Sequence, residues 1–181
     1  MIRVQAAIKP LQRMWSPQGH RRRIVGAGLA APTPLNGKAL GVHQGHHMRT
    51  RLQTAAPVLD DILAKADPRH RGVAAWSAAR WAVARVGLDH PTVAEGLATG
   101  APGDLRALVE ELDAHYFGLQ AMKEAGTVPA EEVEVAFSRA RAASAVDFAA
   151  RGEPAEAVYE AGIAADDWAG LQIVVEAVLR G

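Results

Sequence analysis

The sequence predicts an all-α protein: a compact bundle of about seven helices preceded by a disordered basic arm. From Thr54 onward, apolar residues recur at spacings of three and four, and no alternating pattern typical of strands competes with this period. Prolines stand where helices would start, and glycines stand where many of them would end. The charge also divides the chain, because all 20 acidic residues follow residue 47.

Residues 1–47 form the predicted arm. They contain seven basic residues and no acidic one, whereas residues 48–181 carry a net charge of −7. Every potential helix in the arm is interrupted by one of four prolines, Pro10, Pro17, Pro32 and Pro34. Such a segment cannot bury enough apolar surface to offset its loss of conformational entropy. We therefore expect residues 1–47 to be disordered and residues 48–181 to form one all-helical domain.

Four interpretations of the arm remain open. The abrupt change in composition favours Met48 as the natural start, with the preceding codons being upstream sequence. Three arginines followed by IVGAGLAA have the order of a twin-arginine export signal, which Pro32 truncates. Seven bases without an acid fit a segment that binds nucleic acid or an anionic membrane surface. GAGLAA matches a dinucleotide-binding fingerprint but lacks an adequate strand before it.

Three histidines near the end of the arm are weak candidates for metal ligands. His43, His46 and His47 could each offer an imidazole to zinc or nickel. A structural site needs a fourth ligand and a fixed backbone, and the sequence indicates neither. We therefore expect no evolved metal site and no cofactor.

The helical segments follow one another with short connections. Their approximate ranges are 57–66, 72–86, 91–99, 102–125, 128–152, 153–165 and 166–180. Pro57 and Pro91 fit first helical positions, while Gly87 and Gly126 fit the residues after helix ends. No apolar run approaches the roughly 18 residues that a membrane-spanning helix needs.

The fourth and fifth helices are expected to pack antiparallel as the central pair. The fourth has one stripe at helical spacing, formed by Leu105, Leu108, Leu112, His115, Leu119 and Met122. The fifth has a similar stripe, formed by Val133, Phe137, Ala140, Ser144 and Phe148. Because His115 lies within its stripe, we expect a buried or half-buried imidazole that is hydrogen-bonded to Glu111 or to a group on another helix.

The second helix has a face of alanines and valines that would let a neighbouring helix come close. Trp81 falls nearly opposite this face, between Ser77 and Arg85. Either this helix is covered on both sides, or Trp81 is partly exposed and available to a partner. The candidate binding residues are Trp81, Arg85, His115 and Trp168.

An enzymatic site would have to combine His115 and Glu111 with Ser144 and Asp147 on the facing helix. A serine nucleophile needs a sharp turn with donors for an oxyanion, and Ser144 lies in the middle of a helix. We therefore expect no catalytic residues, and an enzyme with a His115-centred site is the third of our functional alternatives.

The leading hypothesis is a small cytoplasmic bacterial protein of the immunity or adaptor kind, which binds another protein without a cofactor. The Ala, Arg, Gly and Val bias is the basis for the bacterial origin, since it is typical of a high-GC genome. The acidic body favours a basic partner and opposes nucleic acid. The alternative is nucleic-acid binding by the basic arm, which requires that the arm be part of the protein.

The composition change at Met48 makes a direct prediction. Protein isolated from its source cells should have an intact mass and an N-terminal peptide that correspond to a start at Met48. A mass that includes residues 1–47 would contradict this prediction and would make salt-dependent nucleic-acid binding the first activity to test.

Overall fold

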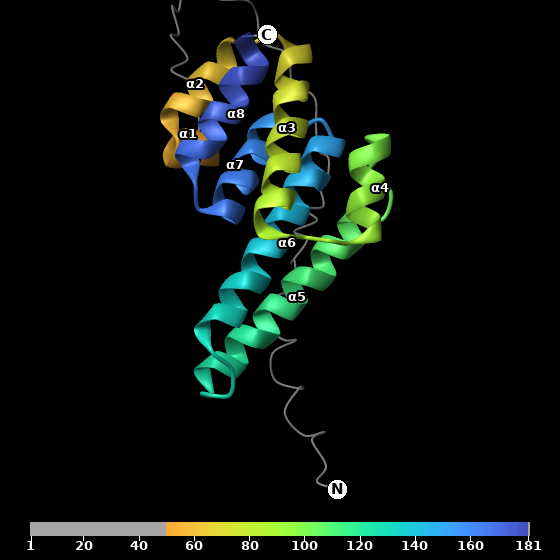
Figure 1. Ribbon diagram of the computed structural model, residues 1–181, viewed down its shortest axis with the longest axis vertical. Helices are drawn as coiled ribbons and strands as arrows, with labels where there is room; N and C mark the ends of the chain where they lie inside the picture. Colours follow the sequence, from red (N-terminus) through yellow and green to blue (C-terminus); the bar gives the residue numbers. More distant parts are fainter. Residues whose placement is uncertain (1–49, 181) are drawn as a thin grey trace, which may run out of the picture. The chain divides into compact units, whose positions relative to one another are not determined.

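The computed structural model describes residues 50–180, and within them it contains eight α-helices and no strand (Figure 1). The helices are α1 (Arg51–Ala55), α2 (Pro57–Lys65), α3 (Pro68–Val86), α4 (Pro91–Thr99), α5 (Leu105–Glu124), α6 (Ala130–Ala150), α7 (Pro154–Ala165) and α8 (Trp168–Arg180). The predicted all-α class is confirmed for these residues. The arm, with Met48, His43, His46 and His47, lies outside the described residues.

The helix boundaries follow the local signals in the sequence. Helices α2, α4 and α7 begin at prolines, as expected for a residue whose fixed φ suits the first turn. Several starts differ from the prediction by a few residues, and the largest difference is at α3. Helix α3 begins at Pro68 because the Asp67 carboxylate accepts the backbone N–H groups of Arg69 and His70, at 2.9 and 3.1 Å. The prediction also missed the short α1, whose first turn is capped by the Thr50 hydroxyl.

Small side chains let the helices α3, α6 and α7 approach one another closely at the centre of the core. Helix α3 packs against α6, α7 and α8, and α6 packs against α7 and α5. We call Ala140–Ala150 the inner half of α6 and 130–139 its outer half. The inner half is buried on nearly every side. The buried alanines of these three helices are Ala74, Ala75, Ala78, Ala79, Ala82, Ala136, Ala140, Ala142, Ala143, Ala145, Ala149, Ala157, Ala161 and Ala164.

One glycine in α7 makes room for a tryptophan of α8. A Cβ atom added to Gly162 would lie 2.2 Å from the ring of Trp168, far inside van der Waals contact. The Trp168 ring also lies 6.3 Å from the ring of Tyr159, between centroids. Gly162 therefore sets how closely the start of α8 packs against α7.

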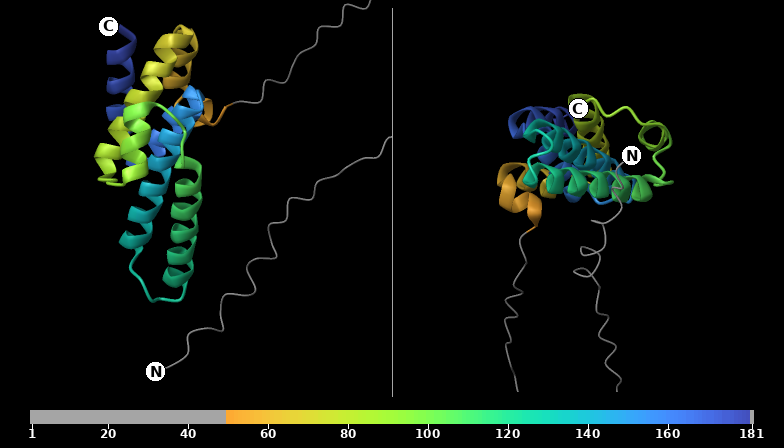
Figure 2. Two further views of the ribbon diagram at one scale, coloured as in Figure 1. Left: turned by 90° about the vertical axis from the view of Figure 1, so that its right-hand side faces the viewer. Right: turned by 90° about the horizontal axis from the view of Figure 1, so that it is seen from below.

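Helices α5 and α6 form an antiparallel hairpin, and its outer half extends beyond the other helices (Figures 1 and 2). The expectation that both helices are central is wrong for α5, which packs mainly against α6 and at its start against α4. Leu105 and Leu108 are buried, whereas Met122 is 46% exposed. His115, expected to be buried or half-buried, is exposed. The helical period identified one face of α5, but no other described helix covers that face along its second half.

The contact between Gly162 and Trp168 predicts a large loss of stability in Gly162→Ala. The added methyl group must displace a packed ring, which should lower the free energy of unfolding by about 1–3 kcal/mol. Gly72→Ala is the matched control, because Gly72 lies in helix α3 with no atom within 4 Å of an added Cβ. It should be neutral or stabilising, by up to about 1 kcal/mol. Urea denaturation measures both, and equal stability of the two variants would contradict the packing described.

Candidate functional site

The four candidate binding residues lie in two different settings. Trp81 and Trp168 are half-buried and pack against the hydrophobic core. Arg85 is exposed at the end of α3 and lies 3.6 Å from the Asp167 carboxylate. His115 is exposed on α5. The two tryptophans therefore have structural roles that a substitution would disturb, whereas Arg85 and His115 are accessible to a partner.

The residues weighed for an enzymatic site do not form a catalytic relay. Ser144 is buried, and its hydroxyl donates to the Ala140 carbonyl at 3.0 Å within its own helix. The Asp147 carboxylate pairs with arginines instead of a histidine, at 3.1 Å from Arg151 and 4.0 Å from Arg106. His115 and Ser144 make no hydrogen bond to each other in the described structure, because they lie at different levels of the hairpin.

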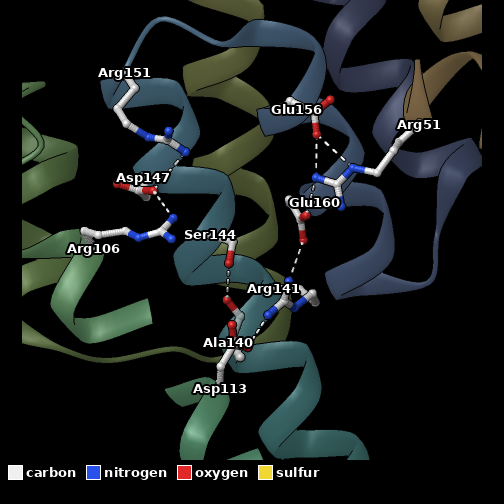
Figure 3. A network of polar contacts seen from close by, with 10 residues as sticks. All are labelled: Arg51, Arg106, Asp113, Ala140, Arg141, Ser144, Asp147, Arg151, Glu156 and Glu160. Atoms are coloured by element: carbon white, nitrogen blue, oxygen red, sulfur yellow. Dashed lines mark hydrogen bonds and ion pairs between the residues drawn. The ribbon is translucent and has the colours of Figure 1, made fainter. Parts of the chain in front are cut away.

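A network of ion pairs joins the helices α1, α5, α6 and α7 (Figure 3). The Glu160 side chain of α7 is only 1% exposed and lies 2.8 Å from Arg51 of α1 and 3.3 Å from Arg141 of α6. Arg141 also pairs with Asp113 of α5, and Arg51 also pairs with Glu156 of α7. The Arg51 guanidinium lies 4.4 Å from the centre of the Tyr159 ring. This network fixes α1, α5 and α7 around α6.

The network has one more carboxylate than guanidinium groups, since Arg51 and Arg141 face Asp113, Glu156 and Glu160. Burial lowers the pKa of the Arg51 guanidinium, but the hydrogen bond with Glu156 and the charges of Glu160 and Glu156 outweigh it, so the pKa lies above its ordinary value. Within residues 50–180, Oδ1 of Asp147 and Nε of Arg141 are buried without a hydrogen-bond partner, which adds a desolvation cost. The same residues contain no group of three side chains suited to hold a metal ion. The ion pairs themselves join α1, α5, α6 and α7.

Sequence reasoning did not identify these buried charges. Asp147 was considered only as a partner of Ser144, and Glu160 and Arg141 were not singled out. A signal was present, since Arg141 and Asp147 lie in RAASAVDFAA, where nearly every other residue is small or apolar. Charged residues within such a segment must face other charges when the segment is buried.

The outer half of the hairpin borders two surface hollows. One lies between α5 and α6, has a volume of about 650 Å³, and is called the furrow here. It is lined by Glu111, Leu112, His115, Leu119, Glu131, Glu132, Val135, Ala136 and Arg139. The second, of about 770 Å³, lies on the other side of the hairpin and is called the aromatic groove. It is lined by Tyr116, Gln120, Lys123, Glu124, Val133, Glu134, Phe137, Ser138, Ile163 and Asp166.

A third hollow lies next to the furrow and is lined by Arg85, one of the candidate binding residues. It has a volume of about 450 Å³, and Arg85 lines it together with Glu131 and Val135 of α6. Both of these α6 residues also line the furrow, as does His115. The structure therefore brings Arg85 and His115 to adjoining hollows around the outer half of α6.

Large apolar side chains are exposed on the same hairpin. Phe117, Met122 and Val135 are 57, 46 and 49% exposed. At 100° per residue, Met122 lies 20° from His115 around α5 and so falls on the furrow side, while Phe117 falls on the opposite side. The Phe117 ring packs beside Tyr116, which in turn lies 5.2 Å from Phe137, between ring centroids. Both sides of the hairpin thus combine apolar surface with hollows.

Comparison of the chain with protein-family models, with curated proteins and with solved structures gives no match.

The buried ion pairs predict that Glu160→Gln destabilises the protein. Removal of the charge leaves Arg51 and Arg141 without their shared carboxylate, and the expected loss is about 2–3 kcal/mol, since both arginines are partly solvated. Asp61→Asn removes half of an exposed pair with Lys65 and should cost less than about 0.5 kcal/mol. Denaturant titration of both variants measures these losses, and a loss for Glu160→Gln as small as that of the control would show that the network contributes little.

Proposed function

We propose that this protein acts by binding another protein through the hairpin of α5 and α6, without a cofactor. The observation that carries the proposal is the exposure of Phe117, Met122 and Val135 beside the hollows of a hairpin that extends beyond the core. Scattered exposed apolar residues are ordinary, but apolar surface gathered beside hollows is typical of interaction sites.

The difference in packing between the inner and outer halves of α6 supports the same proposal. The inner half of α6 is anchored by core packing and by the pairs of Arg141. The outer half extends beyond the other helices with α5 beside it (Figures 1 and 2), although it carries aromatic and aliphatic side chains. Complete removal of such a side chain from water contributes about 1.5–3 kcal/mol, and because these side chains are already about half buried, each would contribute about half of that on binding. A partner that covered this half would therefore gain affinity from surface that contributes little to folding.

Charge supports a protein partner over nucleic acid. The outer half of the hairpin is rich in carboxylates, with Glu124, Glu131, Glu132 and Glu134 exposed. A phosphate backbone would be repelled by this surface, whereas a basic protein would be attracted. The proposal covers adaptor and immunity proteins alike, because both act by occupying the surface of a partner.

The proposal predicts that apolar substitutions on the hairpin abolish capture of a partner while leaving the fold intact. The double variant Phe117→Glu/Met122→Glu should retain its helical circular dichroism, because both side chains are about half exposed. Tagged wild-type and variant chains would be expressed in the source cells, cross-linked and analysed by quantitative mass spectrometry. We expect at least one protein to be recovered with the wild type and lost with the double variant.

Ile173→Glu provides the matched control, since Ile173 is 71% exposed on α8, outside the hairpin. It should recover the same partner as the wild type. If the double variant recovers everything that the wild type and the control recover, the hairpin is not the binding surface and the proposed function is wrong.

A further inference from the structure

The furrow has the form of a site for a third helix. It is bordered on one side by α5 from Glu111 to Leu119 and on the other by α6 from Glu131 to Arg139, and each of these stretches spans about 12 Å at 1.5 Å per residue. Two antiparallel helices of this length leave a groove in which about two turns of another helix can pack at the usual distance of about 8–10 Å. The aromatic groove differs, because Ile163 and Asp166 of α7 close one of its sides.

The floor of the furrow is apolar and only partly covered. Leu112 and Leu119 of α5 are half-buried, and Val135 of α6 is 49% exposed. Ala136 of α6 also lines the furrow and contributes a small apolar side chain. Met122 extends the same side of α5 by a further turn. Such a floor suits the apolar face of an amphipathic helix, whose own backbone hydrogen bonds are already satisfied.

The rim of the furrow has an excess of negative charge. Glu111, Glu131 and Glu132 line it with one permanently charged base, Arg139. Among residues 50–180, none of the three carboxylates forms an ion pair, whereas the buried carboxylates Asp147 and Glu160 each pair with two arginines. The rim carboxylates are therefore available to basic side chains of a partner.

The geometry points to the furrow as the docking site for a basic amphipathic helix of another protein. This inference rests on the proposed protein-binding function and names the partner segment. The partner helix places aliphatic side chains at spacings of three and four on Leu112, Leu119 and Val135. Its lysines or arginines flank that stripe and face the rim carboxylates. Such a helix carries the charge opposite to that of the furrow, and with α5 and α6 it forms a set of three packed helices.

Charge also distinguishes this occupant from a second copy of the chain. Two furrows brought together would place Glu111, Glu131 and Glu132 of one copy against the same residues of the other, and like charges in contact oppose association. A basic helix converts the same carboxylates into attractive contacts. Self-association through the furrow is accordingly one of the results that would overturn the inference.

The test uses the full chain and a synthetic peptide of 16 residues as the probe. The peptide has leucines at spacings of three and four and lysines at the remaining positions, and a second peptide carries glutamates in place of the lysines. Fluorescence anisotropy measures binding, and NMR chemical-shift changes locate it. We expect the lysine peptide to bind, with the largest shifts at Leu112, Leu119 and Val135, and the glutamate peptide not to bind.

Val135→Asp separates docking from simple charge attraction. The substitution removes an apolar contact from the floor and adds a negative charge, so a helix seated in the furrow should bind about tenfold more weakly. A peptide held only by the overall negative charge of the body would bind equally well or more tightly. Ile173→Asp, which adds the same charge outside the furrow, should change the affinity by less than about twofold.

Glu131→Lys/Glu132→Lys tests the rim. Reversal of both charges should weaken binding of the lysine peptide by about tenfold or more, and the effect should shrink as salt is raised. Asp89→Lys/Glu95→Lys makes the same change in net charge at two exposed positions outside the furrow, and it should have a much smaller effect.

Any of the following results would also overturn the inference. The first is that the shifts centre on Tyr116 and Phe137 of the aromatic groove. The second is that the rim variant and its charge-matched control weaken binding equally. The third is that the chain self-associates in sedimentation experiments and that Val135→Asp abolishes this self-association. A native partner could also be lost with Phe117→Glu/Met122→Glu but retained with Val135→Asp. This result would show that the furrow is not the docking site, while the proposed function would still hold.

Discussion

The close packing of α3 and α7 against the inner half of α6 is the constraint on which the rest of the structure depends. This half of α6 is covered on nearly every side, so its side chains must be small, and alanine fills most positions. Because each alanine buries little apolar area, the larger buried side chains come from the surrounding elements, such as Leu52 of α1 and Leu171 of α8. Close packing also explains the glycine at position 162, where any side chain would collide with the Trp168 ring.

Buried charge gives this alanine-rich centre its specific arrangement. Alanine faces are nearly smooth, and helices packed through them could slide or rotate at small cost. Arg141 links Asp113 of α5 to Glu160 of α7, and Arg51 reaches Glu160 from α1, so each helix has one position at which these charges meet. Desolvation offsets much of the attraction within such pairs, and a shifted helix would leave the buried Glu160 carboxylate unpaired, which disfavours other registers.

The sequence determined the fold class and most helix boundaries because the signals are local. Pro57, Pro91 and Pro154 each occupy the first position of a helix, which their fixed φ favours, and Gly87 ends a helix with φ at 61°. Exposure is different, because it depends on which elements lie opposite. The period of α5 placed His115 on the same stripe as Leu105, but only the folded chain shows that other helices cover the start of that stripe and not its middle. For the same reason, Glu160 could not be distinguished from an exposed acid.

The pairing of acids separates the part of the molecule that stabilises the fold from the part that is available for binding. Acids next to the inner half of α6 are paired with arginines, and removal of one partner would leave a charge in a medium of low dielectric constant. Acids along the outer half are solvated, so substitution of Glu131 or Glu132 changes the surface potential with little effect on the core. Apolar residues follow the same division, since Val146 is buried and Val135 is half exposed on one helix. A single helix thus anchors the core at one end and presents an acidic, apolar surface at the other, and under the proposed function substitutions in its outer half alter partner binding while the fold is retained.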